Sequence, residues 1–146
     1  MRPQKRSTHM THIISAFFSN LGDLEKAKAF VDPDAIFVGV REHPDVNLPI
    51  YGTFRGHDGM MRFVGALKDA FDTQLFEIDM VHENPTEGFA TGRFEHRVKR
   101  TGALFRSRWA LFAQFRDGRI SHYRFFEDTA ALEEALGVRT ICREAV

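Results

Sequence analysis

Three long runs of alternating apolar and polar residues follow one another between Phe89 and Asp128. They occupy 89–99, 104–115 and 119–126. Short turns that end in Gly102 and Gly118 join them. Alternation with a period of two predicts β-strands, and tight glycine turns between strands predict antiparallel pairing. Most strands span about five or six residues, so three consecutive runs of this length predict a curled antiparallel meander.

Apolar residues at helical spacing predict helices on both sides of the meander. The predicted helices lie at 11–21, 24–32, 57–71 and 129–136, and two further strands at 35–40 and 75–82. Asp23 and Asp128 are suitable N-caps, and Gly137 is a suitable end for the last helix. The loop at 41–56 is long, and long loops on a scaffold often carry function.

The length suits one domain with a substantial core. We expect that domain at 11–137, preceded by a disordered tail at 1–10 and followed by a loose or partner-contacting tail at 138–146.

The charge balance argues against several partners. The 146 residues carry 20 basic and 20 acidic side chains, so no positive field favours nucleic acid or an anionic membrane. No apolar run approaches the roughly 18 residues that a membrane span needs. The basic N-terminus lacks the apolar segment of a signal peptide, and the single Cys142 suits a reducing compartment, so we expect a cytoplasmic protein.

The two faces of the meander differ in character. The inner, concave face is predicted to carry an aromatic-rich set: Phe94, His96, Trp109, Tyr123, Phe125 and Glu127. The outer face is rich in arginine, yet it also carries three large apolar residues: Phe112, Ile120 and Phe126. A fully solvated face does not need three such groups, so we expect a homodimer through the outer face.

Three segments of the chain carry a resemblance to a known family. They are 20–24 (NLGDL), 51–59 (YGTFRGHDG) and 115–129 (FRDGRI through FEDT). Their order and spacing resemble the NTF2-like cone fold, and in particular its SnoaL-like branch, which is related to polyketide cyclases and ketosteroid isomerases. The resemblance implies an α+β fold in which N-terminal helices pack on a strongly curved, mostly antiparallel sheet that encloses a ligand pocket.

The resemblance does not extend to the catalytic residues of ketosteroid isomerases. In those enzymes a Tyr on the first helix and an acid on a late strand hold the enolate, while an Asp moves the proton. The corresponding positions fall near Ser15, near Trp109 or Leu111, and near Gly39, and none of them carries the required side chain. Nor can the single pocket Asp of SnoaL-type cyclases be placed on the inner face.

His96 and Glu127 are the candidate catalytic residues. A neutral His96 on the apolar face could act as a general base, and the alternative is a histidine hydrogen-bonded within the core or to water. Glu127 at the mouth of a pocket could have a raised pKa and act as an acid or base, and the alternative is an exposed acid at a helix start. The predicted ligand-binding residues are Tyr51, His82, Phe94, Trp109, Tyr123 and Phe125.

Two functions fit these observations. The first is a small-molecule-binding SnoaL-like protein, an isomerase, cyclase or hydratase that acts on an apolar carbonyl compound. The second is a non-catalytic ligand carrier or a dimerisation and partner-binding module. The seven histidines lack metal-site spacing, and there is no phosphate loop, nucleophile elbow or dinucleotide fingerprint, so neither function is expected to use a metal or cofactor.

Overall fold

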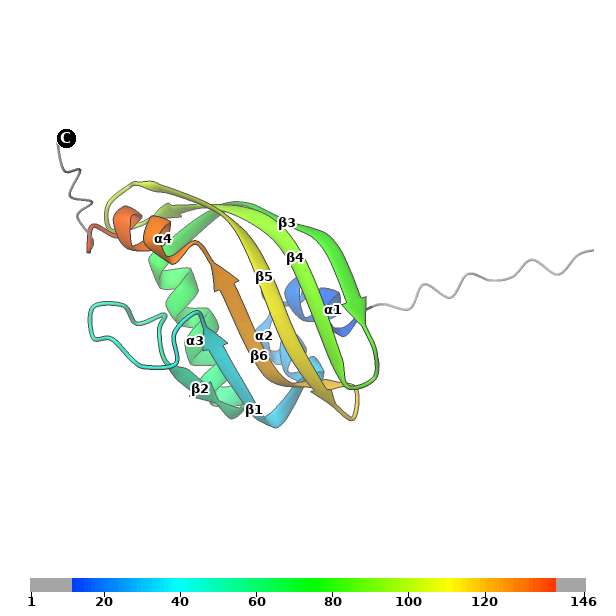
Figure 1. Cartoon of the computed structure of the whole chain (residues 1–146). Helices are drawn as coiled ribbons and strands as arrows, with labels where there is room; N and C mark the ends of the chain where they lie inside the picture. The colour runs from blue at the N-terminus through cyan, green and yellow to red at the C-terminus, as the bar shows by residue number, and fades with distance from the viewer. Residues whose placement is uncertain (1–11, 139–146) are drawn as a thin grey trace, which may run out of the picture.

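The structure, a computed structural model, describes residues 12–138 as a curved sheet that wraps around helices (Figure 1). The predicted tail at 1–10 and all of the predicted tail at 138–146 except Val138 lie outside the described residues. Within that range, no helix is long and apolar enough to cross a membrane.

Six strands form one sheet in the order β2-β1-β6-β5-β4-β3. They are β1 (Val31–Gly39), β2 (Thr53–Arg55), β3 (Phe71–Glu83), β4 (Glu87–Val98), β5 (Leu104–Arg116) and β6 (Arg119–Glu127). All neighbours pair antiparallel except β1 and β6, which run parallel. The curled, mostly antiparallel α+β architecture predicted from the sequence is therefore confirmed, and its last three strands form the expected meander.

The helices pack mainly on the concave side of the sheet. They are α1 (Ile13–Ser19), α2 (Leu24–Ala27) with a 3₁₀ turn (Lys28–Phe30), α3 (Gly56–Ala70) and α4 (Thr129–Ala135). Aromatic side chains fill the space between helices and sheet: the Phe37 ring lies 5.8 Å from that of Phe17, 6.1 Å from Phe63 and 4.7 Å from Tyr123. The predicted caps are also present, because the Asp23 and Asp128 side chains accept hydrogen bonds from Lys26 N and Ala131 N.

Register shifts explain where the predicted strand ends are wrong. β1 begins at Val31 rather than at residue 35, and Pro33 lies within it, where the pairing with β6 shifts between Val31 and Ile36. β3 begins at Phe71 rather than at residue 75, and a shift after Thr73 breaks the alternation there. The short β2 lies inside the segment predicted to be a loop.

Two further register shifts move side chains to the opposite face. Ile120 was predicted on the outer face, but a shift between Gln114 and Phe115 turns it into the core, where its exposed fraction is 0%. His82 was predicted on the inner face, but a shift between Ile78 and Met80 places it opposite Phe89. Because Phe89 is 52% exposed on the outer face, His82 lies there as well.

Glu83 at the end of β3 holds the start of α1. Its two carboxylate oxygens accept hydrogen bonds from the backbone N–H groups of Ile13 and Ile14, each at 2.8 Å. His12, which precedes the helix, provides no side-chain cap. Two of the otherwise unpaired N–H groups of the first turn are thus satisfied by a residue about 70 positions away in sequence.

We expect Glu83→Ala to lower the free energy of unfolding by about 1–2 kcal/mol, because both hydrogen bonds to α1 are lost. Glu83→Gln retains one acceptor oxygen and should have a smaller effect. Urea denaturation measures both. The control is Glu87→Ala at the exposed start of β4, which should change the value by less than about 0.5 kcal/mol. Equal effects of the Glu83 and Glu87 variants would contradict this role.

Candidate functional site

A cavity of about 300 Å³ lies between the helices and the concave face of the sheet, and we name it the cone cavity. It is lined by Phe18, Leu21, Gly39, Val40, Ile50, Phe63, Val64, Leu67, Lys68, Phe71, Thr73, Phe76, His96, Tyr123, Phe125 and Glu127. Both candidate catalytic residues belong to this lining, and most of their neighbours are apolar. The few polar groups therefore determine what chemistry the cavity can perform.

Glu127 is the last residue of β6 and has a strongly perturbed pKa. Burial, and secondarily the negative charge of Asp128, raise the pKa of Glu127 to about 8. Its carboxyl group makes no hydrogen bond or ion pair with any residue from 12 to 138. The helix-cap role belongs to the neighbouring Asp128 instead. At neutral pH Glu127 is thus mainly a neutral carboxylic acid with a free proton to donate into the cavity.

His96 is held between two aromatic rings. Its imidazole stacks on Phe94 at 4.1 Å and on Phe71 at 4.8 Å, at interplanar angles of 24° and 12°. Nδ1 lies 3.0 Å from Thr73 Oγ1, in hydrogen-bonding contact. Burial lowers the pKa of His96 to about 4, so the ring is neutral at physiological pH. A ring fixed in this way can take or give a proton, or hydrogen-bond a ligand, through Nε2.

His96 and Glu127 serve different parts of the cone cavity. Gly92, Trp109 and Glu127 lie directly opposite one another on β4, β5 and β6, and His96 is four residues farther along β4. Strand geometry thus separates the backbones of His96 and Glu127 by roughly 13 Å along the strands and about 10 Å across them. The two groups do not form a catalytic pair at one atom.

Tyr123 and Phe125 line the cone cavity as predicted. Their rings are nearly parallel at 6.2 Å and 8°, and Tyr123 also stacks on Phe37. Burial, together with the charge of Glu127, raises the pKa of Tyr123 above its usual range, so its hydroxyl stays protonated. Tyr123 therefore offers a permanent hydroxyl to the cavity.

Trp109 lies behind the lining rather than in it. Its indole is sandwiched between Phe76 at 5.1 Å and Phe125 at 5.3 Å, with Phe18 tilted against it. The indole Nε1 is buried without a hydrogen-bond partner among residues 12–138. Trp109 thus sets the position of three lining phenylalanines and does not itself line the cavity.

The remaining predicted ligand-binding residues lie around the cone cavity without lining it. Phe94 is fully buried and acts by stacking on His96. Tyr51 is buried near the end of the 41–52 loop, which connects β1 to β2, with the Arg41 guanidinium 5.5 Å from its ring centroid. Burial, followed by the nearby charges of Glu133 and Glu127, raises the pKa of Tyr51 to about 12. His82 lies on the outer face, away from the cavity.

Sequence reasoning missed two polar groups of the lining. Thr73, the partner of His96, fell outside the predicted strand, although a β-branched residue two positions after Phe71 continues the alternation. Lys68, near the end of α3, donates from Nζ to the Leu21 carbonyl at 2.7 Å. The sequence pattern did not mark Lys68 as a lining residue, because a lysine on a helix is usually exposed. Its position next to the apolar Leu67 was the sole indication. Among residues 12–138, no cluster of His, Cys, Asp or Glu side chains is suited to hold a metal ion.

Solved structures with this fold resemble the chain along most of its length. An NTF2-like protein from Burkholderia thailandensis is 23% identical, with a TM-score of 0.72 over 85% of this chain and 94% of that chain. A proposed isomerase from Rhodopseudomonas palustris is 21% identical, with a TM-score of 0.75 over 88% and 98%. TerC, co-crystallised with polyporic acid, is 19% identical, with a TM-score of 0.73 over 86% and 95%. These likenesses confirm the NTF2-like cone fold.

A search of curated protein sequences found no significant match. By contrast, residues 14–123, well over half of the chain, match the family described as the SnoaL-like domain. The motifs that suggested this resemblance are in the described fold, and the cone cavity lies where the resemblance places a pocket. The chain belongs to the SnoaL-like family.

Proposed function

We propose that the protein binds an apolar carbonyl compound in the cone cavity and moves a proton on it without a cofactor, as an isomerase, cyclase or hydratase does. The observation that carries this proposal is the Glu127 carboxyl group, which lines an apolar cavity with its pKa raised to about 8. A carboxylic acid that remains protonated at neutral pH is suited to donate to a carbonyl oxygen.

Glu127 acts as the general acid in this proposal. It gives its proton to the carbonyl oxygen as electron density moves from the C=O bond to that oxygen. The resulting carboxylate then takes up the proton that the ligand loses when the product forms, which restores the starting acid. Tyr123, four residues earlier on the same strand, has a hydroxyl that stays protonated and donates to another part of the ligand.

His96 orients the other end of the ligand in this proposal. It is neutral, fixed by Thr73 and by two phenylalanines, and separated from Glu127 by the width of the cavity. A ligand that reaches both groups is elongated, has an apolar body, and carries a hydrogen-bonding group at each end. The aromatic walls formed by Phe63, Phe76 and Phe125 suit a flat body.

The similar structures support this choice of ligand class at the level of the fold. One is a proposed isomerase, and TerC was crystallised with the small molecule polyporic acid. A protein from Xanthomonas campestris that is proposed to be a polyketide cyclase also shares the fold, at 18% identity. We infer a small organic ligand for the present cavity from its own lining and from these three examples together.

The experiment is a turnover screen with apolar carbonyl compounds, followed by kinetics of variants on any substrate found. Glu127→Gln keeps the shape but not the acid and should lower kcat/KM by about 10²–10⁴-fold. His96→Ala should mainly raise KM, because a positioning contact is lost. The matched control is His122→Ala on the exposed side of β6, which should leave kinetics unchanged. Full activity of both Glu127→Gln and His96→Ala would reject the site.

A non-catalytic ligand carrier is the second candidate. It is favoured by Gly39, which lines the cavity where the isomerase base would be expected and has no side chain. In that case ligand binding survives in Glu127→Gln and no compound in the screen is converted. Binding measurements on the same variants therefore separate the two candidates.

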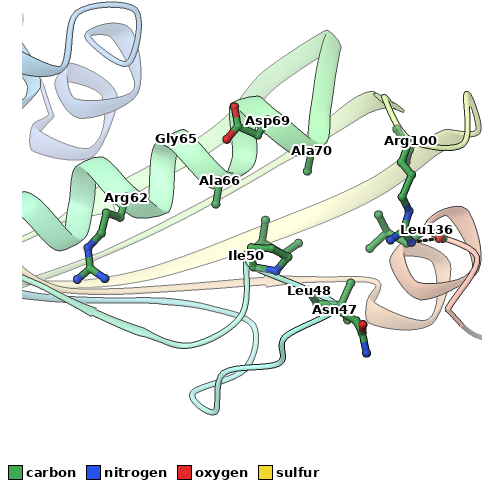
Figure 2. Close-up of a pocket in the computed structure, with 12 residues that line it drawn as sticks. Asn47, Leu48, Ile50, Arg62, Gly65, Ala66, Asp69, Ala70, Arg100 and Leu136 are labelled. Atoms are coloured by element: carbon green, nitrogen blue, oxygen red, sulfur yellow. Dashed lines mark hydrogen bonds between the residues drawn. The ribbon is translucent and has the colours of Figure 1, made fainter.

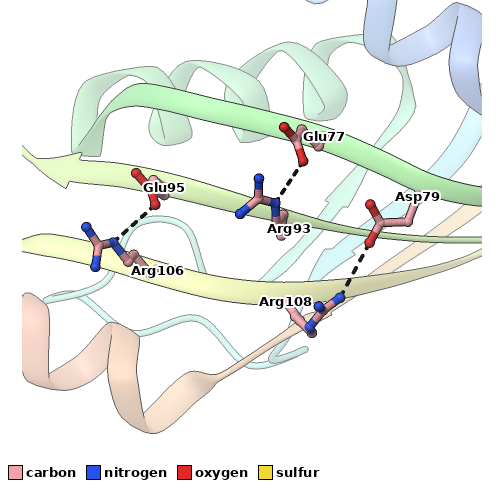
Figure 3. Close-up of polar contacts among 6 residues, drawn as sticks. All are labelled: Glu77, Asp79, Arg93, Glu95, Arg106 and Arg108. Carbon is pink, nitrogen blue, oxygen red and sulfur yellow. Dashed lines mark hydrogen bonds and ion pairs between the residues drawn. The ribbon is translucent and has the colours of Figure 1, made fainter.

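We also propose that the outer face of β4, β5 and β6 is a homodimer interface. Phe89 and Phe126 are 52% and 45% exposed there, and Phe112 packs against Phe89 at 5.0 Å. Ion pairs extend this face across β3 to β5 (Figure 3), namely Arg93 with Glu77 at 2.7 Å, Arg106 with Glu95 at 3.2 Å and Arg108 with Asp79 at 3.4 Å. Apolar residues beside alternating charges suit a self-complementary contact.

Sedimentation equilibrium at micromolar concentration should give a dimer for the wild-type chain and a monomer for Phe126→Asp. The introduced carboxylate would have to be buried unpaired at the interface. Val46→Asp serves as the control, since Val46 is 95% exposed in the loop between β1 and β2 and should leave the dimer intact. A monomeric wild-type chain would refute the interface.

A further inference from the structure

A second cavity, of about 500 Å³, lies between α3 and the loop that carries Leu48 and Ile50 (Figure 2). The α3 residues that line it, at 62, 65, 66, 69 and 70, face away from those at 63, 64 and 67 that line the cone cavity. The second cavity is lined by Asn47, Leu48, Pro49, Ile50, Arg62, Gly65, Ala66, Asp69, Ala70, Val98, Arg100 and Leu136. These residues come from the 41–52 loop, α3, the end of β4 and the end of α4. Only Ile50 also lines the cone cavity, so it forms the wall between the two.

The sequence of α3 produces the second cavity. Its residues at 60, 63, 64 and 67 point large apolar side chains into the core, as expected for an amphipathic helix. A second stripe at 62, 65, 66, 69 and 70 has the same helical spacing, and three of its five residues are small: Gly65, Ala66 and Ala70. Because these three side chains are so small, the loop residues Leu48 and Ile50 do not reach the helix surface, and an apolar space remains.

The charge around the second cavity is positive. Arg62 and Arg100 extend from opposite ends of it (Figure 2), and Asp69 is the one acidic residue of the lining, so two positive charges stand against one negative charge. Arg100 already donates to the Leu136 carbonyl. Arg62 is exposed, and its guanidinium carbon lies 5.9 Å from the centroid of the Phe54 ring. Neither arginine forms an ion pair with a carboxylate within residues 12–138, so an anionic group is the complement that this cavity lacks.

We propose that the second cavity is a binding site for an apolar carboxylate. The hydrocarbon part lies along Gly65, Ala66 and Ala70 against Leu48 and Ile50, and the carboxylate pairs with Arg62 at the open end. This site is separate from the acid chemistry of Glu127, and it does not depend on turnover in the cone cavity. The cone cavity also has a cation, Lys68, but its Nζ already donates to the Leu21 carbonyl. The Arg62 guanidinium, by contrast, has no hydrogen bond or ion pair within residues 12–138.

The test is isothermal titration calorimetry of the full chain with octanoate, and with 1-octanol as the uncharged compound of equal chain length. Octanoate should bind more tightly than 1-octanol. Ala66→Trp fills the second cavity and should abolish octanoate binding, whereas Leu67→Trp, on the next residue, fills the cone cavity and should leave it unchanged. Arg62→Met keeps an apolar stem without the charge and should weaken octanoate about tenfold but not 1-octanol.

Several outcomes would overturn the proposal. Undiminished binding in Ala66→Trp, or loss of binding in Leu67→Trp alone, would place octanoate elsewhere. Equal affinities for octanoate and 1-octanol, or no effect of Arg62→Met, would remove the role of charge. Absence of any binding to the wild-type chain would also reject the site. Arg62→Met keeps the proposal testable even if the large Ala66→Trp substitution prevents folding, because Arg62 is exposed.

Discussion

Gly92→Ala is expected to lower the free energy of unfolding by about 3 kcal/mol, because β4 has no space for a methyl group at this position. An added Cβ would lie 1.9 Å from the Glu77 carbonyl oxygen on β3 and 2.5 Å from Trp109 Cζ2. The first contact is with backbone, so rotation of a side chain cannot relieve it. Strands β3 and β4 must separate, and the indole that supports three lining phenylalanines must move.

Denaturation by urea, followed by the fluorescence of Trp109, measures this effect, because Trp109 is the sole tryptophan. The matched control is Gly65→Ala in the interior of α3, where no atom outside its chain neighbours and the backbone of its own helix lies within 4 Å of the added Cβ. That variant should be stabilised by about 0.5–1 kcal/mol, since alanine favours a helix over glycine. A Gly92→Ala protein that unfolds at the wild-type urea concentration would show that the strands are not packed as described.

Stability is expected to fall by about 2 kcal/mol between pH 6.5 and pH 9, and Glu127→Gln should remove this dependence. Burial raises the pKa of Glu127 from 4.5 to about 8, so the folded chain holds a proton that the unfolded chain has released. This stabilisation is complete below pH 4.5 and disappears as the pH rises through about 8. Ionising Glu127 in the cone cavity without a partner is what destabilises the fold at higher pH.

The pH range from 6.5 to 9 separates the effect of Glu127 ionisation on stability from that of His96 protonation. The pKa of His96 is lowered from 6.5 to about 4, so its protonation destabilises the folded chain only as the pH falls below 6.5. Thermal or urea unfolding at several pH values between 6.5 and 9 gives the slope. Glu134→Gln, an exposed acid on α4, should keep the wild-type slope, whereas a slope that persists in Glu127→Gln would contradict the raised pKa.

Strand periodicity and turn chemistry were sufficient to predict the fold and several of the side chains that line the cone cavity. Simple alternation placed His96, Tyr123, Phe125 and Glu127 on the concave face, and all four line the cone cavity. Alternation succeeds there because β4 and the C-terminal half of β6 pair with β5 in an unbroken register. The apolar environment of Glu127 followed from the same pattern, which is why its raised pKa could be anticipated.

Alternation failed wherever an extra residue enters a strand. Asp79 and Ser121 are the extra residues at two such points. Each one reverses the face on which the following or preceding side chains lie. This reversal explains why the predicted faces of His82 and Ile120 were wrong. Neither residue is a glycine or a proline, so no local signal marks the shift. His82 and Ile120 have ordinary strand sequences around them, and only the pairing partner reveals which way they point.

The second cavity could not be predicted because it arises from segments that meet only in the folded chain. Ala66 and Ala70 read as ordinary helix residues, and Arg62 as an exposed one. Their significance depends on Leu48 and Leu136, which arrive from a loop and from the last helix. A sequence pattern reports the faces of one element at a time, and a space between elements depends on all of them at once.

The position of β6 in the sheet has a consequence for how the protein is made. β6 lies between β1 and β5, and its pairing with β1 joins residues as distant as Val31 and Ile120. During synthesis, β1 and β5 leave the ribosome with one edge each unpaired, and only the segment that ends at Glu127 can satisfy both. The sheet therefore closes only after β6 has left the ribosome, and a nascent chain that stops at Gly118 presents these two open edges to chaperones and to other chains.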